Sequence, residues 1–277
     1  MSKADESFIA MCKDILEQGY SSEGQQVRAK WEDTGEPAHT VKRFGIVNRY
    51  DLEQEFPALT LRPVPIKNCV DELLWIWQKK SNRVADLRSH IWDAWADESG
   101  TIGKAYGYQL GVPYRFAQGE MDQVDNVLWQ LKHAPASRRI LTNLYNFADL
   151  PEMGLEPCAY SVTFNVTGTK LNAILNQRSQ DTLVANNWNV VQYAVLVHML
   201  AQVSGLVAGE LIHVIADAHI YDRHIPIVKE LLARPAYPAP KFRLNPEITD
   251  FYDFTVDDVV LENYQAGPQI KNIPVAV

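Results

Sequence analysis

The chain has 277 residues, enough to bury a full hydrophobic core as one large domain or two modest ones. Hydrophobic residues make up 47% and charged residues 22%, which is typical of a globular enzyme. The net charge of −8 excludes a protein that binds nucleic acid through a basic surface, although a few arginines could still hold one phosphate.

The cysteine pattern and the N-terminus indicate the compartment. The chain has an odd number of cysteines, namely Cys12, Cys69 and Cys158, and no two of them form a CxxC pair. We therefore expect free thiols in a reducing cytoplasm. The opening "MSKADESFIA" carries acids where a signal peptide would be basic and then apolar. The uncharged stretch 182–209 is interrupted by amides, a histidine and a serine, which are costly in lipid, so it predicts a buried helix and no membrane span.

Two helices are predicted in the N-terminal half from its periodicity. The first helix is predicted from about Glu6 to Gln18, ended by Gly19. Residues 66–80 carry apolar side chains at spacings of three and four, which predicts an amphipathic helix with Cys69 on its buried side.

The period changes to two in the second half. "AYSVTFNV" and "LNAILNQR" predict two strands joined by the turn "TGT". "NVVQYAVLVHMLAQVSG" predicts a central buried helix, and "GELIHVIADAHIY" another strand. Without linkers, repeats or a βαβ rhythm, the chain is expected to be one domain, residues 1–277, of the α+β class, with helices on one face of a large mixed sheet.

Four stretches place polar groups inside apolar surroundings, and each has a purely structural explanation. Cys158 follows "EP" at a strand start, where a free cysteine is more often a core residue than a nucleophile. "NQRSQD" offers Arg178 and Ser179 to a phosphate, and "SRRI" offers two more arginines, but any of them could be a surface charge.

The third and fourth stretches concern a base and a sugar. Asn189, in "NNWN", could pair with the O4 and N3–H edge of uracil, or could simply cap the helix. In "ADAHIYDRH", Asp217, His219 and Tyr221 share one face of an extended segment, and His219 and Tyr221 would suit a sugar hydroxyl. The spacing of the histidines and cysteines fits no zinc pattern, so no metal is expected.

In combination and order these stretches resemble the thymidylate synthase family. "EPC", "QRSQD", "NNWNVVQYAVLVHMLAQVSG", "ADAHIYDRH" and "PVAV" occur in the family's order, and "VDELLWIWQ", "IWDAWAD", "KAYGYQLG" and "SRRI" precede them. The resemblance runs from about Phe8 to Val277 and implies an α+β homodimer that packs sheet to sheet. It also implies reductive methylation of dUMP to dTMP, with 5,10-methylenetetrahydrofolate as co-substrate and no metal.

The resemblance assigns roles to matching positions. Cys158 matches the nucleophile that adds to C6 of dUMP, and Glu72 matches the acid that organises proton transfer, with Tyr106 beside it. The implied dUMP ligands are Arg28, Gln177, Arg178, Ser179, Asn189, His219 and Tyr221, with Asp217 in support and with Arg138 and Arg139 supplied by the partner subunit. The implied folate contacts are Trp92, Trp95, Asp181 and the carboxylate of Val277, with Arg62 matching a lysine that meets the folate's glutamate tail.

The chain departs from the family pattern mainly around the folate. Ala159 replaces a common histidine, Ala216 replaces a glycine, and Ala185 and Asn187 alter a loop that usually carries glycine and proline. Pro63 and Pro65 stand where basic residues are more frequent.

Three other activities are weighed against this one. A dUMP hydroxymethylase of the same superfamily would finish with water in place of hydride, whereas Trp92 and the "PVAV" tail favour exclusion of water. A cysteine hydrolase would pair Cys158 with His219. A catalytically inactive protein that only holds RNA is disfavoured by the acidic charge.

Overall fold

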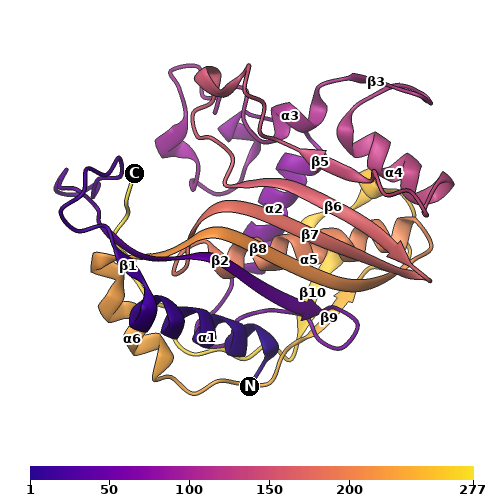
Figure 1. Cartoon of the computed structure of the whole chain (residues 1–277). Coiled ribbons are helices and arrows are strands. Elements are labelled where there is room, and N and C mark those ends of the chain that lie inside the picture. The colour runs from indigo at the N-terminus through magenta and orange to yellow at the C-terminus, as the bar shows by residue number, and fades with distance from the viewer.

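A computed structural model describes residues 1–277. Its centre is a six-stranded mixed sheet in the order β1-β2-β8-β7-β6-β5 (Figure 1). The strands of this sheet are β1 (Tyr20–Ser21), β2 (Thr40–Asp51), β5 (Leu141–Asn143), β6 (Ala159–Thr167), β7 (Lys170–Asp181) and β8 (Val207–Tyr221). Only β7 and β8 pair in parallel, and α5 connects them as a crossover; every other pair is antiparallel.

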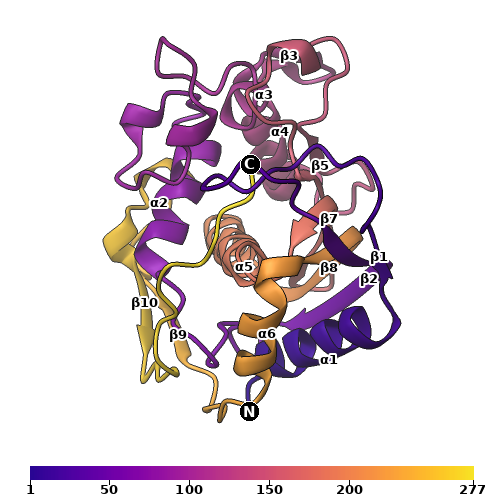
Figure 2. The same ribbon diagram turned by 90° about the vertical axis from the view of Figure 1, so that its left-hand side faces the viewer.

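Helices cover one face of this sheet, as the sequence predicts. Figure 2 looks along α5, with α2 on one side of it and the sheet on the other. The helices are α1 (Lys3–Gln18), α2 (Ile66–Trp77), α3 (Gly107–Gly111), α4 (Gln123–His133), α5 (Asn186–Val203) and α6 (Ile225–Leu232). Two small hairpins complete the fold: β3 (Tyr114–Phe116) with β4 (Gly119–Met121), and β9 (Lys241–Leu244) with β10 (Val259–Glu262).

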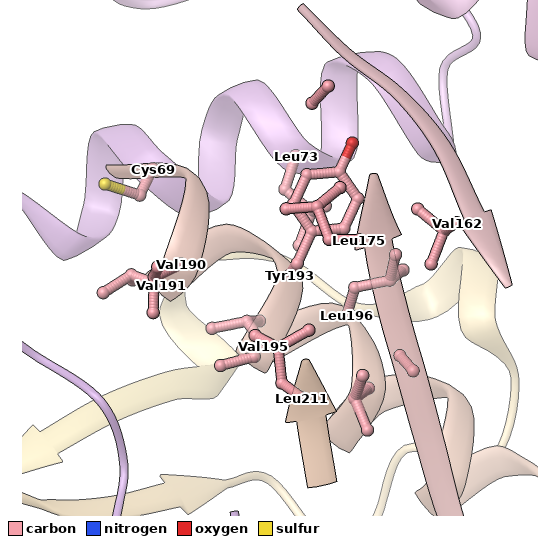
Figure 3. Close-up of a cluster of buried hydrophobic side chains, with 14 of the residues drawn as sticks. Cys69, Leu73, Val162, Leu175, Val190, Val191, Tyr193, Val195, Leu196 and Leu211 are labelled. Carbon is pink, nitrogen blue, oxygen red and sulfur yellow. The ribbon is translucent and has the colours of Figure 1, made fainter. Parts of the chain in front are cut away.

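The core lies between α5, α2 and the inner face of the sheet. Figure 3 shows Tyr193, Val195 and Leu196 of α5 facing strand residues, with Cys69 of α2 nearby. Cys69 is fully buried, which confirms its predicted place on the buried side of α2, and Cys12 is fully buried as well. Because α5 is apolar nearly all round, it can be surrounded by protein on every side. No helix combines enough length and apolarity to cross a membrane.

The opposite face of the sheet is open and partly apolar. Alternation along each strand sends one set of side chains to α5 and the other set outward. Gly45, with a φ of 79° and no partner in the β2–β8 register, interrupts the alternation of β2, so that Phe44 (88% exposed) and Val47 (53%) are both exposed on either side of it; Ile174 on β7 is 37% exposed. Such a patch is unusual on a surface that stays in water.

Two predicted boundaries are wrong. The first helix begins at Lys3, before the predicted Glu6, because Ser2 caps it and forms a reciprocal capping box with Asp5. The second helix ends at Trp77, and the chain then reverses at Lys80, whose φ of 51° is incompatible with helix. The "TGT" turn is confirmed, with Gly168 at a φ of 62°.

Candidate active site

The predicted site residues come mainly from one end of the sheet. The parallel register sets Ser179 beside Asp217 and Asp181 beside His219, at the carboxyl ends of β7 and β8. Cys158 stands just before β6, and its carbonyl accepts a hydrogen bond of 2.9 Å from the Arg178 backbone. The first turn of α5 begins at the same end, since it follows β7 directly.

Cys158 is held by its neighbours before any ligand arrives. The Arg178 guanidinium donates to the carbonyls of Pro157 (3.0 Å) and Glu156 (2.7 Å), which clamps the rigid lead-in that proline imposes. The Cys158 backbone N–H donates to the Tyr106 hydroxyl at 3.1 Å. Burial raises the pKa of the thiol, while Arg178, Tyr106 and Arg28 act in the opposite direction.

Tyr106 reaches Cys158 through an unusual backbone. Its φ of 45° is rare for a residue with a side chain, and it directly precedes α3. The following residue, Gly107, packs so closely that a Cβ there would lie 2.4 Å from the Ser81 carbonyl oxygen. The buried Tyr106 ring also meets Trp92 edge-on, with centroids 5.0 Å apart. This strain is consistent with a residue placed for function.

Glu72 is a buried carboxylate without a cationic partner. Trp92 Nε1 donates to its Oε1, and Trp188 Nε1 donates to its Oε2. Gln192 Nε2 also donates to Oε2, at 2.5 Å. Burial raises the pKa of Glu72, and the three N–H donors limit that rise.

The sequence reasoning missed Trp188 and Gln192 as partners of Glu72. Both lie on α5, and the two residues are four apart, so they share a helix face. That spacing was available in the sequence, but nothing there shows that this face meets α2.

Asn189 lies in the first turn of α5 and is not its cap, because the capping position is Ala185. Its Oδ1 accepts a hydrogen bond of 3.1 Å from Gln177 Nε2. Its Nδ2 donates to Gln192 Oε1 at 3.4 Å. The capping alternative is therefore wrong, and the amide lies among other amides.

The two predicted sugar contacts, His219 and Tyr221, share one face of β8 with the supporting Asp217, as alternation requires. His219 Nδ1 lies 2.9 Å from Asp217 Oδ1, and the His219 ring meets Tyr221 edge-on at 5.1 Å. Asp217 also pairs with Lys42 of β2 at 2.9 Å. Tyr221 is packed in turn by Trp31, with ring centroids 5.6 Å apart.

The predicted folate residues divide into two groups. Trp92 and Trp95 lie edge to face with centroids 5.6 Å apart, and Trp92 reaches Glu72 as described. A separate groove nearby is lined by Arg62, Pro63, Val64, Pro65, Val184, Asn187, Trp188 and Gln269. Trp188 therefore connects the groove with Glu72.

Asp181 is occupied by local contacts. Its Oδ1 accepts the backbone N–H groups of Leu183 and Val184, and its Oδ2 lies 3.7 Å from His224 Nδ1. Although burial raises the pKa of Asp181, His224 and the hydrogen bonds lower it overall. His224 was not predicted as part of the site.

The C-terminal tail lies against the segment that follows Arg28. Val277 and Lys30 exchange two backbone hydrogen bonds of 2.9 Å each, and His224 Nε2 is 2.8 Å from the Pro274 carbonyl. Figure 2 shows the C-terminus beside this N-terminal segment. Arg28 itself is exposed and lies close enough to Cys158 and Tyr221 to influence both electrostatically.

Arg138 and Arg139 do not join the site of their own chain. Both are exposed, and they precede Ile140, whose carbonyl accepts from Phe164 on β6. Phe164 is six residues beyond Cys158, which is roughly 20 Å along a strand. The backbone of these two arginines is therefore distant from Cys158, while the Arg139 side chain lines a pocket beside β5 with Asn143, Tyr145 and Asn146. No group of three or more histidine, cysteine, aspartate or glutamate side chains is placed to hold a metal ion.

Comparison with known proteins agrees with this arrangement. The family model described as thymidylate synthase matches residues 6–277. The chain belongs to the thymidylate synthase family. It is 47% identical over 274 residues to a thymidylate synthase of Bacillus licheniformis and 46% identical to thymidylate synthase 1 of Bacillus subtilis, covering 98% of each chain in both comparisons. The solved thermostable thymidylate synthase A from Bacillus subtilis superposes with a TM-score of 0.94 at 45% identity and 99% coverage of both chains.

Membership confirms several expectations. The chain is a methyltransferase of the thymidylate synthase family, whose overall reaction converts dUMP to dTMP with methylenetetrahydrofolate as co-substrate. The hydroxymethylase alternative is not favoured, since the matching relatives are thymidylate synthases.

Proposed function

We propose that this chain methylates dUMP through a covalent bond between Cys158 and C6 of the pyrimidine. The observation that carries the proposal is the half-buried thiol between Arg178 and Tyr106, at the same end of the sheet as Asn189. Tyr106 lies within electrostatic range of both Cys158 and the buried carboxylate of Glu72. A cysteine hydrolase is disfavoured, because Cys158 shows no hydrogen bond to His219 and its backbone N–H and thiol instead meet Tyr106 and the Glu156 carbonyl.

The nucleotide would lie across the ends of β7 and β8. Arg28, Arg178 and Ser179 would hold the phosphate, since guanidinium groups and a hydroxyl suit its oxygens. Asn189 and Gln177 would meet the base, and His219 and Tyr221, supported by Asp217, would meet the 3′-hydroxyl. Lys42, paired with Asp217, further fixes this side of the site.

The residues then act in sequence. The Cys158 thiolate adds to C6, and the displaced electron pair makes C5 nucleophilic while negative charge develops on O4. Asn189, and Glu72 through water, would stabilise that charge as it forms. 5,10-Methylenetetrahydrofolate supplies the one-carbon unit and the hydride and leaves as dihydrofolate. In order, C5 attacks that methylene, and loss of the C5 proton toward the Glu72 and Tyr106 region then breaks the bond to the folate. Hydride transfer from the released tetrahydrofolate completes the methyl group, forms dihydrofolate and expels Cys158.

The folate site proposed here combines the tryptophan pair with the groove. Trp92 and Trp95 would pack on the pterin, and Arg62 in the groove would meet the glutamate tail. Arg62 already donates to the Leu183 carbonyl at 2.6 Å, so it is positioned before folate binds. Asp181 and the Val277 carboxylate would complete the site, and the docked tail would exclude water from the intermediate.

We further propose that two copies pack sheet to sheet. The exposed apolar face that contains Phe44, Val47 and Ile174 needs cover, and a second copy would supply it symmetrically. Arg138 and Arg139 lie far from their own Cys158, which supports the expectation that they complete the phosphate site of the partner.

One catalytic domain, residues 1–277, is proposed because a single cluster of 57 buried residues runs from Phe8 to Val259. A cytoplasmic location is supported by the three free cysteines.

The test is direct turnover. The protein is incubated with dUMP and methylenetetrahydrofolate, dihydrofolate absorbance is followed, and the nucleotide product is identified by mass. We expect dTMP and equimolar dihydrofolate. Hydroxymethyl-dUMP without dihydrofolate would overturn the proposal.

A variant links this activity to the thiol. Cys158→Ser is expected to lower turnover at least a thousandfold and to retain dUMP binding, because the hydroxyl is a far weaker nucleophile. Binding is measured by calorimetry. Substantial remaining turnover would remove Cys158 from the mechanism.

A further inference from the structure

We infer that Gln192 is a positioning residue that locks the Asn189 amide in the one orientation that pairs with uracil. The inference deepens the proposed function and rests on it, since it explains how the same site would choose between dUMP and dCMP. Gln177 forms the other half of this clamp around Asn189.

The orientation of Gln192 follows from groups that can only accept. Its Nε2 donates to the backbone carbonyl of Cys69 at 3.1 Å and to Glu72 Oε2 at 2.5 Å. A carbonyl accepts whatever the protonation state of Glu72, so the amide nitrogen must face Cys69. The oxygen of Gln192 therefore faces Asn189 and accepts from its Nδ2 at 3.4 Å.

Gln177 is fixed by the same logic from the other side. Its Nε2 donates to the Ser179 carbonyl at 3.2 Å and to Asn189 Oδ1 at 3.1 Å. Its Oε1 lies 2.7 Å from Nε2 of His213. Burial lowers the pKa of His213 to about 3, so this ring is neutral, and its Nε2–H donates to Gln177 while Nδ1 has no partner.

The side-chain amide of Asn189 cannot exchange the positions of its oxygen and nitrogen between these two amides. A flip would set its nitrogen against the nitrogen of Gln177 and its oxygen against the oxygen of Gln192. Gln192 is only 3% exposed, so water cannot replace the lost partners there. The amide keeps one free hydrogen on Nδ2 and one free lone pair on Oδ1.

Those free positions match uracil and oppose cytosine. Uracil offers O4 as an acceptor and N3–H as a donor, which pair with Nδ2 and Oδ1 in the locked orientation. Cytosine offers an amino group and a bare N3, which would require the flipped amide. Selectivity would therefore come from the clamp around Asn189 as well as from Asn189 itself.

The test is Gln192→Met, which nearly preserves length and volume and removes both the donor and the acceptor. Dissociation constants for dUMP and dCMP are measured by calorimetry on the full-length protein. We expect the preference for dUMP to fall about tenfold, the contribution of one buried hydrogen bond. An unchanged ratio would overturn the inference.

Gln202→Met is the matched control. Gln202 lies on the same helix, and its amide donates to the carbonyls of Asn245 and Ile248, both at 2.8 Å, away from the site. The Gln202→Met variant should lose stability as Gln192→Met does, and its preference for dUMP over dCMP should equal that of the wild type. A fall in preference in this control as large as in Gln192→Met would also overturn the inference.

Gln192→Glu provides a second test of the inference if the methionine variant does not fold. The new side chain still presents an oxygen to Asn189, so the dUMP preference should survive even though a second carboxyl beside Glu72 slows turnover. A lost preference in this variant would contradict the clamp. Wild-type protein that makes no dTMP would instead refute the proposed function, so the two failures are distinguishable.

Discussion

Glu72 is the residue whose surroundings depart most from the usual pattern for a buried carboxylate. Buried charges normally have a cationic partner, whereas this one has three neutral N–H donors from Trp92, Trp188 and Gln192. The pKa of Glu72 is raised by burial and restrained by those donors. Its protonation should therefore respond to the loss of any one of them.

Trp188→Phe tests this response. Phenylalanine keeps an aromatic wall in the groove and removes one N–H that stabilises the carboxylate, so the pKa of Glu72 should rise further. The acidic limb of the rate profile should then move to higher pH by up to one unit. The measurement is kcat as a function of pH.

Wild-type protein under the same buffers is the reference, and Trp129→Phe, a substitution of an exposed tryptophan on α4, is the matched control. If the profile of Trp188→Phe superposes on that of the wild type, Trp188 only packs.

The roles of individual site residues can be predicted from the sequence where the order of the motifs along the chain identifies the family. Cys158, Arg178 and Asn189 belong to stretches whose order identifies the family. The contacts of Trp188 and Gln192 with Glu72 join residues 116 and 120 positions apart, and no local pattern encodes which helix faces meet.

At the scale of elements, α1 shows how a helix end can hold a loop in place. Asp5 closes the capping box with Ser2, and its carboxylate also accepts from the Thr60 backbone at 2.8 Å and from the Thr60 hydroxyl at 2.6 Å. Thr60 and Arg62 belong to one short loop, so the cap of α1 helps to place a wall of the folate groove.

Asp5→Ala should lower the free energy of unfolding by about 3 kcal/mol, because two buried donors on Thr60 lose a charged acceptor. Urea unfolding followed by circular dichroism is the measurement. Glu6→Ala is the control, since its contact with Lys3 is exposed and should contribute little. Equal losses in the two variants would show that Asp5 acts only through the helix terminus.

The sequence predicts which elements exist better than where they begin. The strands β6, β7 and β8 follow from alternation, and α5 follows from its continuous apolar character. The start of α1 was missed because Ser2 and Asp5 stand before the first periodic residues. The twelve-residue strand β2 was not predicted, because Lys42, Arg43 and Arg49 and the interruption at Gly45 obscure its alternation. The short strands β1, β3, β4 and β5 were not predicted either, since two or three residues carry no detectable period.

At the scale of the whole molecule, the proposed dimer makes a quantitative prediction. Cys158→Ser lacks the nucleophile and Arg139→Ala lacks an arginine expected to serve the partner, so each homodimer should be nearly inactive. After the two are unfolded together and refolded, half of the dimers are mixed, and each has one complete site. Activity should recover to about a quarter of the wild-type value.

Refolding each variant alone is the control, and the measurement is dihydrofolate formation. No recovery in the mixture would place Arg139 in the site of its own chain, and an active Arg139→Ala homodimer would place it outside any site. The α+β class and the single core can be predicted from the sequence alone. The association of two copies cannot, because it depends on an apolar outer face that forms only when the strands pair in the sheet.

The pairing of β2 with β8 has a consequence for how the chain is made. Arg49 on β2 and Glu210 on β8 meet across 161 residues of sequence. A ribosome adding 5–20 residues per second needs about ten to thirty seconds to cover that distance. Throughout that interval the N-terminal segment has emerged without its sheet neighbour, so its apolar residues are open to chaperones or to a neighbouring nascent chain. The rate of translation between these two strands should therefore influence the yield of active enzyme.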